Sequence, residues 1–261
     1  MSRHIRDLLD LTGRTALITG GSRGLGLQVA EALGEAGARV MLTSRKDADL
    51  RTAAAHLESR GIRADWVAGD AADPAEIERI CSEASARLGT IDVLVNNAGA
   101  TWGAPAEDHP LAAWDKVMNL NVRSAFLFSQ HIAKQHMIPR RQGRILMMAS
   151  IAGLRGNRPG QDTAAYNTSK AALINLTRVL AGEWGEFGIT VNALAPGWFP
   201  SKMSRGLIEA HGADRMAALA PLNRLGDDED LKGAALLFAS AAGKHITGQV
   251  LAVDGGAAAI L

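Results

Sequence analysis

The chain has 261 residues and a mass of 27.4 kDa, is 47% hydrophobic and 21% charged, and carries a formal net charge of +1. These values exclude a disordered, collagen-like or coiled-coil chain and argue against a strongly basic surface for nucleic acid. The single cysteine, Cys81, excludes an internal disulfide bond and a cysteine-cluster metal site, and Tyr166 is the single tyrosine.

The apolar runs predict neither a secretory signal nor a membrane span. Residues 1–11 mix charged with apolar side chains and lack the continuous apolar core of a signal peptide. No stretch reaches the roughly 18 uncharged apolar residues that a span requires. The scarcity of cysteine fits a reducing compartment. We therefore expect a soluble, cytoplasmic protein with no membrane partner.

Short strand-like runs alternate with helical sequence along the chain. The predicted strands are Thr15–Thr19, Val40–Thr43, Asp65–Ala68, Val93–Val95, Arg144–Met148, Thr190–Ala193 and Val250–Val253. The clearest helical segments are Leu25–Ala36, Pro74–Arg87, Ala112–Met137 and Tyr166–Phe187. Several strands are almost continuously apolar, as parallel strands covered on both faces are. The pattern predicts an α/β fold, a Rossmann-type doubly wound parallel sheet of about seven strands with helices on both faces.

The domain organisation is predicted to be simple. No internal repeat or low-complexity linker divides the chain, and the one shift in composition, at 201–230, is richer in glycine, methionine and charge. We read that shift as an excursion from the sheet. The prediction is a single domain over residues 1–261, with a substrate lid at about 198–222.

The first predicted strand runs into the glycine-rich segment Thr19–Gly26, and helical sequence follows at once. Glycines there allow a tight turn and let a phosphate approach backbone N–H groups at a helix start. The spacing of Gly20, Gly24 and Gly26 reads G-x-x-x-G-x-G, which differs from the common G-x-G-x-x-G fingerprint. We interpret the segment as a dinucleotide-binding loop, with a purely structural turn as the alternative.

The end of the second strand bears on the choice of dinucleotide. NAD-preferring folds place an acidic residue there to accept from the ribose 2′-OH, whereas this chain has Ser44 and Arg45. A cation beside a 2′-phosphate gains a charge-assisted contact, and Arg23 could supply a second one. The pattern favours NADP(H) over NAD(H), unless both arginines are simply solvated. Asp70, after the third strand, is a candidate acceptor for an adenine amino group or a helix N-cap.

Tyr166 and Lys170 form the candidate proton-transfer pair. Residues four apart share one face of a helix, so their side chains can be neighbours. A phenol has a reference pKa near 10 and is a poor base at neutral pH, whereas a nearby ammonium and an oxidised nicotinamide both favour the phenolate. Lowering the pKa by about 2–3 units requires roughly 3–4 kcal/mol. The Y-x-x-x-K spacing alone is common in helices.

Taken together, these motifs give the chain a resemblance to the short-chain dehydrogenase/reductase family over nearly its whole length, residues 11–256. The motifs occur in the order typical of the family: Thr19–Gly26, Asp70, Asn96-Asn97-Ala98-Gly99, Asn121, Ser150, Tyr166-x-x-x-Lys170, Pro196-Gly197 and Val253-Asp254-Gly255-Gly256. The resemblance implies an oxidoreductase that interconverts a ketone and a secondary alcohol with a nicotinamide cofactor.

The resemblance implies a catalytic role for each of four residues. Ser150 would hydrogen-bond the substrate oxygen, and Tyr166 would be the general acid in reduction and the base in oxidation. Lys170 would lower the pKa of Tyr166 and hold the nicotinamide ribose hydroxyls. Asn121 would anchor a water-linked proton relay behind Lys170; Asn119 is the rival, and Asn121 matches the family spacing better.

The predicted cofactor site combines both lines of reasoning. By resemblance, 97–99 would steady the central sheet and line the cofactor, and 196–197 would pass beside the nicotinamide. Ser201 replaces the family's usual threonine, and its hydroxyl can make the same bond to the carboxamide. The residues predicted to contact NADP(H) are Gly20, Ser22, Arg23, Gly24, Leu25, Gly26, Ser44, Arg45, Asp70, Ala71, Asn97, Ala98, Gly99, Tyr166, Lys170, Pro196, Gly197 and Ser201.

Ser150 and Tyr166 stand farther apart than in many family members. The additional residues fall in 156–162, where a loop tolerates insertion at small cost in stability. The insertion would lie at the mouth of the active site and shape substrate choice, or it is a neutral surface insertion.

Substrate class is predicted from short resemblances and from the lid. Residues 101–105 and 199–203 resemble 3-oxoacyl reductases and also gluconate 5-dehydrogenase-like members. The side chains of Trp198, Phe199, Met203, Leu207, Ile208 and Met216 would give the lid an apolar lining or simply pack it. We predict NADPH-dependent reduction of a 3-oxoacyl-type ketone. The alternative is a gluconate 5-dehydrogenase-like sugar or polyol dehydrogenase that uses Arg155, Asn157, Arg158 and Gln161. A non-catalytic, dinucleotide-sensing relative is a remote alternative.

The expected partners are few. We predict a small ketone or alcohol as substrate and no nucleic acid, because no basic stripe interleaves with aromatic residues. No metal is expected, since the seven histidines are scattered without ligand spacing. The resemblance suggests a homotetramer or homodimer, and helices over 112–137 and 166–187 are long and apolar enough to share a bundle.

Overall fold

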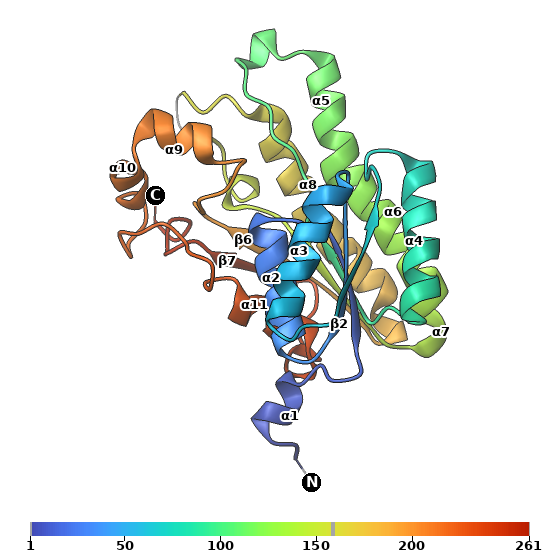
Figure 1. Ribbon diagram of the computed structural model, residues 1–261. Helices are drawn as coiled ribbons and strands as arrows, with labels where there is room; N and C mark the ends of the chain where they lie inside the picture. The colour runs from blue at the N-terminus through green and yellow to red at the C-terminus, as the bar shows by residue number, and fades with distance from the viewer. Residues whose placement is uncertain (1, 158–159, 261) are drawn as a thin grey trace.

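The computed structural model describes residues 2–157 and 160–260. Seven parallel strands form one sheet in the order β3-β2-β1-β4-β5-β6-β7 (Figure 1). The strands are β1 Thr15–Thr19, β2 Arg39–Ser44, β3 Ala64–Ala68, β4 Val93–Asn96, β5 Gly143–Met148, β6 Ile189–Pro196 and β7 Val250–Val253. All seven predicted strands are confirmed, and the doubly wound α/β class with them.

Helices cover both faces of this sheet. They are α1 Ile5–Leu9, α2 Gly24–Glu35, α3 Asp47–Ser59, α4 Pro74–Leu88, α5 Leu111–Met118, α6 Ser124–Ile132, α7 Ile138–Arg140, α8 Ala164–Trp184, α9 Arg205–His211, α10 Ala213–Ala217 and α11 Lys232–Ala239. Buried side chains of α4, α6 and α8 form the core on one face, and those of α2, α3 and α11 form the core on the other. No helix in the described ranges is long and apolar enough to cross a membrane.

The central strands bury both of their faces, because successive side chains along a strand point to opposite sides of the sheet. In β1, Leu17 enters one core, whereas Ala16 and Ile18 enter the other. In β2, Met41 joins the core of Leu17. Strands with two buried faces need apolar residues at every position, which is why β1 and β2 read as continuous apolar runs.

Two features of the helices differ from the expectation. Helix α3 was not predicted, although its buried residues Leu50, Ala53, Ala54 and Leu57 follow helical spacing. The segment 112–137, expected as one continuous helix, contains π-helical turns at η2 Asn119–Arg123 and η3 Ala133–Met137. A π turn inserts one extra residue into a helix and often marks a functional position. The extra residue shifts the helical phase of the apolar positions after it, but the nine residues of α6 between the two turns are too few to show that shift.

The topology determines where a ligand can bind. Strand β1 pairs with β2 on one side and with β4 on the other, so the chain leaves β1 in one direction and later returns in the opposite one. The loops after β1 and β4 therefore diverge and open a crevice at the carboxyl edge of the sheet. Residues 198–222 leave this edge after β6 and carry α9 and α10. That 1–261 form a single domain with a lid at 198–222 stays a prediction.

Candidate active site

A cleft of about 1290 Å³ opens along the carboxyl edge of the sheet. It exceeds the usual volume of a small-molecule pocket, which is about 300–1,000 Å³, and has room for a dinucleotide beside a substrate. Every residue predicted to contact NADP(H) lines this cleft, and so does Ser150. Asn121 alone of the predicted set lies behind the cleft wall, 1% exposed.

The glycine loop after β1 is braced by Asn97 from the end of β4. The Asn97 Nδ2 donates to the carbonyl oxygens of Thr19 at 2.9 Å and Gly20 at 3.0 Å. A Cβ on Gly20, whose φ is +65°, would lie 2.9 Å from that amide nitrogen, and a Cβ on Gly26 would overlap it. A Cβ on Gly24 would meet only Ser201, at an ordinary 4.0 Å, but Gly24 has a φ of +54°, which disfavours a side chain. The loop therefore needs glycine at all three positions.

Thr19 completes this brace and was not among the predicted residues. Its hydroxyl accepts hydrogen bonds from the backbone N–H groups of Asn97 and Ala98, each at 3.0 Å. It can donate to the Val95 carbonyl at 3.3 Å. The sequence signal was a hydroxyl residue at the last position of a buried apolar strand, where an aliphatic side chain would otherwise be expected.

The end of β2 holds the groups predicted to select the cofactor. The Ser44 hydroxyl oxygen is buried and has no hydrogen-bond partner among the described residues. Arg45 is exposed at the cleft. Arg23 is not a free cation, because its Nη1 lies 3.3 Å from Oδ2 of Asp49. Asp49 was not predicted because it belongs to α3, a helix that was not predicted either.

Asp70 and Ala71 line the cleft after β3. The Asp70 Oδ1 accepts from the Ala72 N–H at 3.0 Å, which orders the turn and leaves the carboxylate at the cleft. Asp73 caps α4 instead, accepting from the Ala75 N–H at 2.9 Å. Asp73, rather than Asp70, therefore caps α4, so the N-cap alternative given for Asp70 is wrong.

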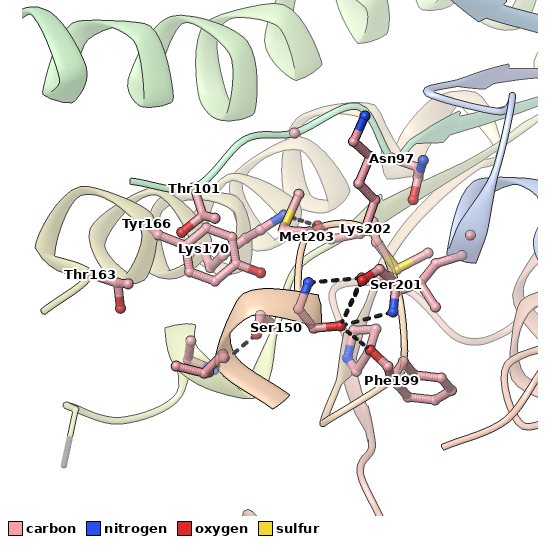
Figure 2. Close-up of a pocket in the computed structure, with 18 of the residues that line it drawn as sticks. Asn97, Thr101, Ser150, Thr163, Tyr166, Lys170, Phe199, Ser201, Lys202 and Met203 are labelled. Atoms are coloured by element: carbon pink, nitrogen blue, oxygen red, sulfur yellow. Dashed lines mark hydrogen bonds between the residues drawn. The ribbon is translucent and has the colours of Figure 1, made fainter. Parts of the chain in front are cut away.

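Ser150, Tyr166 and Lys170 come together in the cleft from β5 and α8 (Figure 2). The Lys170 Nζ lies 5.5 Å from the centre of the Tyr166 ring and donates to the Met148 carbonyl at 2.7 Å. Ser150 accepts from the Ala152 N–H at 3.1 Å, a bond that turns the chain after β5 and holds the serine at the cleft. Lys170 is only 4% exposed.

Burial controls the protonation of this pair. It raises the pKa of Tyr166, and the hydroxyl of Ser150 opposes that rise. Burial also lowers the pKa of Lys170 to about 8. In the chain without cofactor, desolvation therefore outweighs the lowering of the Tyr166 pKa that the sequence analysis assigned to Lys170. Any lowering has to come with the positive charge of the bound nicotinamide.

Asn121 lies in the π turn η2 and is fully engaged. Its Oδ1 accepts from the Ala100 N–H at 2.8 Å, and its Nδ2 donates to the Ala100 carbonyl and to Ser169 Oγ, each at 2.9 Å. The side chain thus joins the end of β4 to α8 one residue before Lys170. Asn119, the rival, lines a separate surface groove on the outer side of the helix. The proton relay stays a prediction.

The segment after β6 brings Ser201 over the glycine loop. Gly197 packs against Asp254, which leaves no room for a Cβ, and its N–H donates to the Val253 carbonyl at 3.0 Å. Ser201 and Ser204 then form a compact turn, with their hydroxyl oxygens 3.0 Å apart (Figure 2). Ser204 Oγ also donates to the Phe199 carbonyl at 2.6 Å. These bonds hold the turn at the cleft, which Ser201 and Ser204 both line.

The loop between Ser150 and Tyr166 uses its polar side chains within the protein. Arg155 donates to the carbonyls of Ala257 and Ile260. The Asn157 amide bonds to the side chains of Thr163, at 3.0 Å, and Asn167, at 2.7 Å. Of the four side chains proposed to bind sugar hydroxyls, Arg155 and Asn157 therefore already have hydrogen-bond partners within the protein. Gln161 lines the cleft, and Arg158 lies outside the described residues.

The apolar residues predicted for the lid divide into two groups. Phe199 and Met216 are 5% and 3% exposed, so they pack the segment onto the body. Trp198, Met203 and Leu207 line the cleft, and Met203 is 47% exposed. Phe199 belongs to both groups, because it also lines the cleft, and Ile208, which is half-buried and does not line the cleft, belongs to neither.

These observations fit a dinucleotide. The loop is shaped by glycines that a Cβ would disrupt, and α2 begins without a side-chain cap, so its first N–H groups face the cleft unblocked by a side chain. The buried Ser44 hydroxyl has no hydrogen-bond partner among the described residues, so it is free to bond to a polar ligand at the end of β2. Among the described residues, no group of three or more histidine, cysteine or acidic side chains could hold a metal ion.

Comparison with known proteins agrees with this geometry. The family model described as Enoyl-(Acyl carrier protein) reductase matches residues 20–258. The chain is 38% identical to gluconate 5-dehydrogenase of Gluconobacter oxydans over 96% of both chains. It is also 38% identical to the rhamnolipids biosynthesis 3-oxoacyl-[acyl-carrier-protein] reductase of Pseudomonas aeruginosa, over 94% of this chain and 96% of that protein.

A solved structure shows the same fold. It is the crystal structure of a gluconate 5-dehydrogenase from Burkholderia cenocepacia in complex with NADP and tartrate. The two chains superpose with a TM-score of 0.93 at 36% identity, over 99% of this chain and 100% of the other. Two enzymes with different named substrates thus resemble this chain equally well in sequence, so overall similarity does not select the substrate.

The ionisation of Tyr166 can be measured directly, because it is the only tyrosine in the chain. In the cofactor-free protein we expect the phenolate absorbance to appear with a midpoint above 10, since burial raises the pKa. Added NADP⁺ should move the midpoint down. Tyr166→Phe is the control and should abolish the signal. A midpoint below 10 without cofactor would contradict this assignment of burial as the dominant effect.

Lys170→Met should stabilise the fold at pH 7. A lysine pKa of about 8 in the folded state means that the buried ammonium destabilises the protein by about 3 kcal/mol below that pH. Between about 8 and the unfolded value of 10.5 the unfolded chain binds more protons, so wild-type stability rises with pH in that window. In urea denaturation, the free energy of unfolding of the variant should therefore exceed that of the wild type by more at pH 7 than at pH 10. An advantage independent of pH would contradict the prediction.

Proposed function

The chain belongs to the short-chain dehydrogenase/reductase family and is an oxidoreductase that acts on CH–OH groups with NAD(P), and from this premise we propose that it reduces a 3-oxoacyl-type ketone with NADPH. The observation that carries the proposal is the lining of the cleft beyond the reacting pair. Many side chains there are apolar, while Arg155 and Asn157 are bonded within the protein. The apolar residues include Ala104, Pro105, Ile151, Trp198, Met203, Leu207 and Leu219.

The proposed chemistry assigns one task to each residue of the cleft. The bound cofactor supplies the hydride. Ser150 donates a hydrogen bond to the substrate carbonyl oxygen, and the Tyr166 hydroxyl transfers its proton to that oxygen as the alcohol forms. The Lys170 ammonium lies close enough to stabilise the phenolate that remains. One of its three N–H groups is used by the Met148 carbonyl, so two are available for ribose hydroxyls.

The preference for NADP(H) is supported by the end of β2. Ser44 and the exposed Arg45 stand where an acidic residue would favour NAD(H). A guanidinium binds a phosphate with two parallel, charge-assisted bonds, whereas a ribose hydroxyl gains much less from it. The resemblance to a structure solved with NADP agrees with this choice.

A second candidate is a sugar or polyol dehydrogenase. The favouring observation is that Thr101, Gln161 and Lys202 also line the cleft. Lys202 is exposed, and a cation at the mouth suits an acidic sugar. A relative that is 38% identical is named gluconate 5-dehydrogenase. In this alternative the enzyme would oxidise a secondary alcohol, with Tyr166 as the base.

The quaternary structure is also part of the proposal. We propose a homodimer or homotetramer in which η2, α6 and α8 meet their counterparts. A surface groove runs between these elements, and the large apolar residues Phe126 and Val179 beside it are 38% and 44% exposed. A cytoplasmic location is proposed on the single, buried Cys81, which fits a reducing compartment.

A panel of substrates with both cofactors tests the proposed reaction. We expect kcat/KM for 3-oxoacyl thioesters to rise with chain length, because each added methylene finds apolar lining. NADPH should be preferred to NADH. Tyr166→Phe should reduce kcat by about 10²–10⁴-fold with little change in cofactor affinity. Faster turnover of acidic sugars or polyols than of any 3-oxoacyl thioester would favour the second candidate.

The proposed interface is tested by molar mass in solution. Phe126→Asp combined with Val179→Glu should shift the protein toward the monomer mass of 27.4 kDa, because two charges would be buried in an apolar contact. Leu111→Asp is the matched control, since Leu111 is 72% exposed and lies outside the groove. Light scattering after size exclusion measures both. A monomeric wild-type protein would overturn the proposal.

A further inference from the structure

The ion pair between Arg23 and Asp49 stands at the end of the cleft where β1 and β2 finish. Arg23 belongs to the glycine loop and Asp49 to the first turn of α3, and their closest charged atoms are 3.3 Å apart. The two side chains are 55% and 36% exposed. An ion pair this exposed is weak, because water competes for both groups. Arg23 is therefore held by Asp49 but can be released at little cost.

The neighbouring charges do not share this arrangement. Arg45 and Lys46 precede α3 and are exposed. Asp47 lies in the same helical turn as Asp49, yet its oxygens are used elsewhere, by Trp66 Nε1 at 2.8 Å and by Arg51 at 2.9 Å. In the described part of the chain, Asp49 has no side-chain hydrogen-bond partner other than Arg23. Arg23 is thus the one charged side chain that Asp49 contacts directly among the described residues.

We propose that Asp49 is a specificity-determining residue that restrains the preference of this chain for the 2′-phosphorylated cofactor. The inference rests on the proposed function, in which Arg45 binds the 2′-phosphate, and on the expectation from the sequence that Arg23 supplies a second cation. The phosphate and the Asp49 carboxylate are both anions, so they compete for the Arg23 guanidinium. A cofactor with a 2′-phosphate must take Arg23 from Asp49, and it then lies near a negative charge.

A cofactor without the 2′-phosphate meets neither obstacle. It leaves the pair of Arg23 and Asp49 intact and brings no second anion to this end of the cleft. Asp49 therefore lowers the affinity for NADPH and leaves the affinity for NADH unchanged. Repulsion between one exposed carboxylate and a phosphate dianion a few ångströms away, in largely aqueous surroundings, corresponds to about a threefold to tenfold change in affinity.

A purely structural role for Asp49 makes a different prediction. An acidic residue in the first turn of a helix stabilises the helix through its dipole, and both Asp47 and Asp49 occupy that turn of α3. If helix stabilisation were the only role, Asp49→Asn and Asp47→Asn would act alike, and neither would distinguish the two cofactors. The ratio of the two dissociation constants therefore separates the roles.

The experiment measures binding of NADPH and NADH to the full chain by titration calorimetry, without substrate. Asp49→Asn should tighten NADPH binding about threefold to tenfold and leave NADH unchanged. Asp47→Asn should leave the ratio at the wild-type value. In an Arg23→Gln background, Asp49→Asn should no longer affect NADPH, because the contested cation is absent. Higher salt should reduce the effect, since both charges are exposed.

Two outcomes would overturn the inference. One is an Asp49→Asn variant with an unchanged NADPH dissociation constant, and the other is an equal change for both cofactors. An Arg45→Ala arm separates this failure from failure of the proposed cofactor preference. If Arg45→Ala weakens NADPH selectively while Asp49→Asn has no effect, NADP(H) preference stands and the role of Asp49 is wrong. If neither variant affects selectivity and NADH binds better, the cofactor proposal itself fails.

Discussion

The candidate site depends on one amide. The Asn97 side chain joins the end of β4 to the loop that follows β1, at the place where those loops would otherwise separate. Because the same amide occupies the space that a Cβ on Gly20 or Gly26 would need, the glycines and the asparagine require one another. The Thr19 hydroxyl secures the backbone of the same junction. The crevice at the switch point of the sheet is thereby given a fixed shape before any ligand arrives.

A second set of polar contacts extends this rigidity to the reacting groups. Asn121 bonds to Ala100, which follows β4, and to Ser169 of α8. Lys170 is the next residue along that helix. Lys170 in turn bonds to the Met148 carbonyl at the end of β5. Three secondary-structure elements thus meet around one buried ammonium. Burial raises the free-energy cost of the Lys170 charge. The same low-dielectric surroundings strengthen the electrostatic effect of that charge on Tyr166.

The features predicted correctly from the sequence are those in which one structural requirement selects one type of residue. Buried parallel strands require apolar runs, so all seven were found, and the tightly packed turn after β1 requires glycine, so the position of that turn was found as well. Prediction fell short where a contact joins residues far apart in the chain. Two examples are the bond from Arg155 to the Ile260 carbonyl and the ion pair of Arg23 with Asp49. Neither contact produces a periodic pattern in the sequence. The π turns were not predicted because the nine residues of α6 between them are too few to show a shift in helical phase.

The bonds from Arg155 to the Ala257 and Ile260 carbonyls have a practical consequence for handling the protein. They anchor the end of the chain to the loop that follows Ser150, and Ala257 itself lines the cleft. An affinity tag fused at the C-terminus would start beside this anchor and compete for space at the substrate entrance. Helix α1 projects from the opposite edge of the sheet (Figure 1). Purification tags and surface-immobilisation linkers therefore belong at the N-terminus.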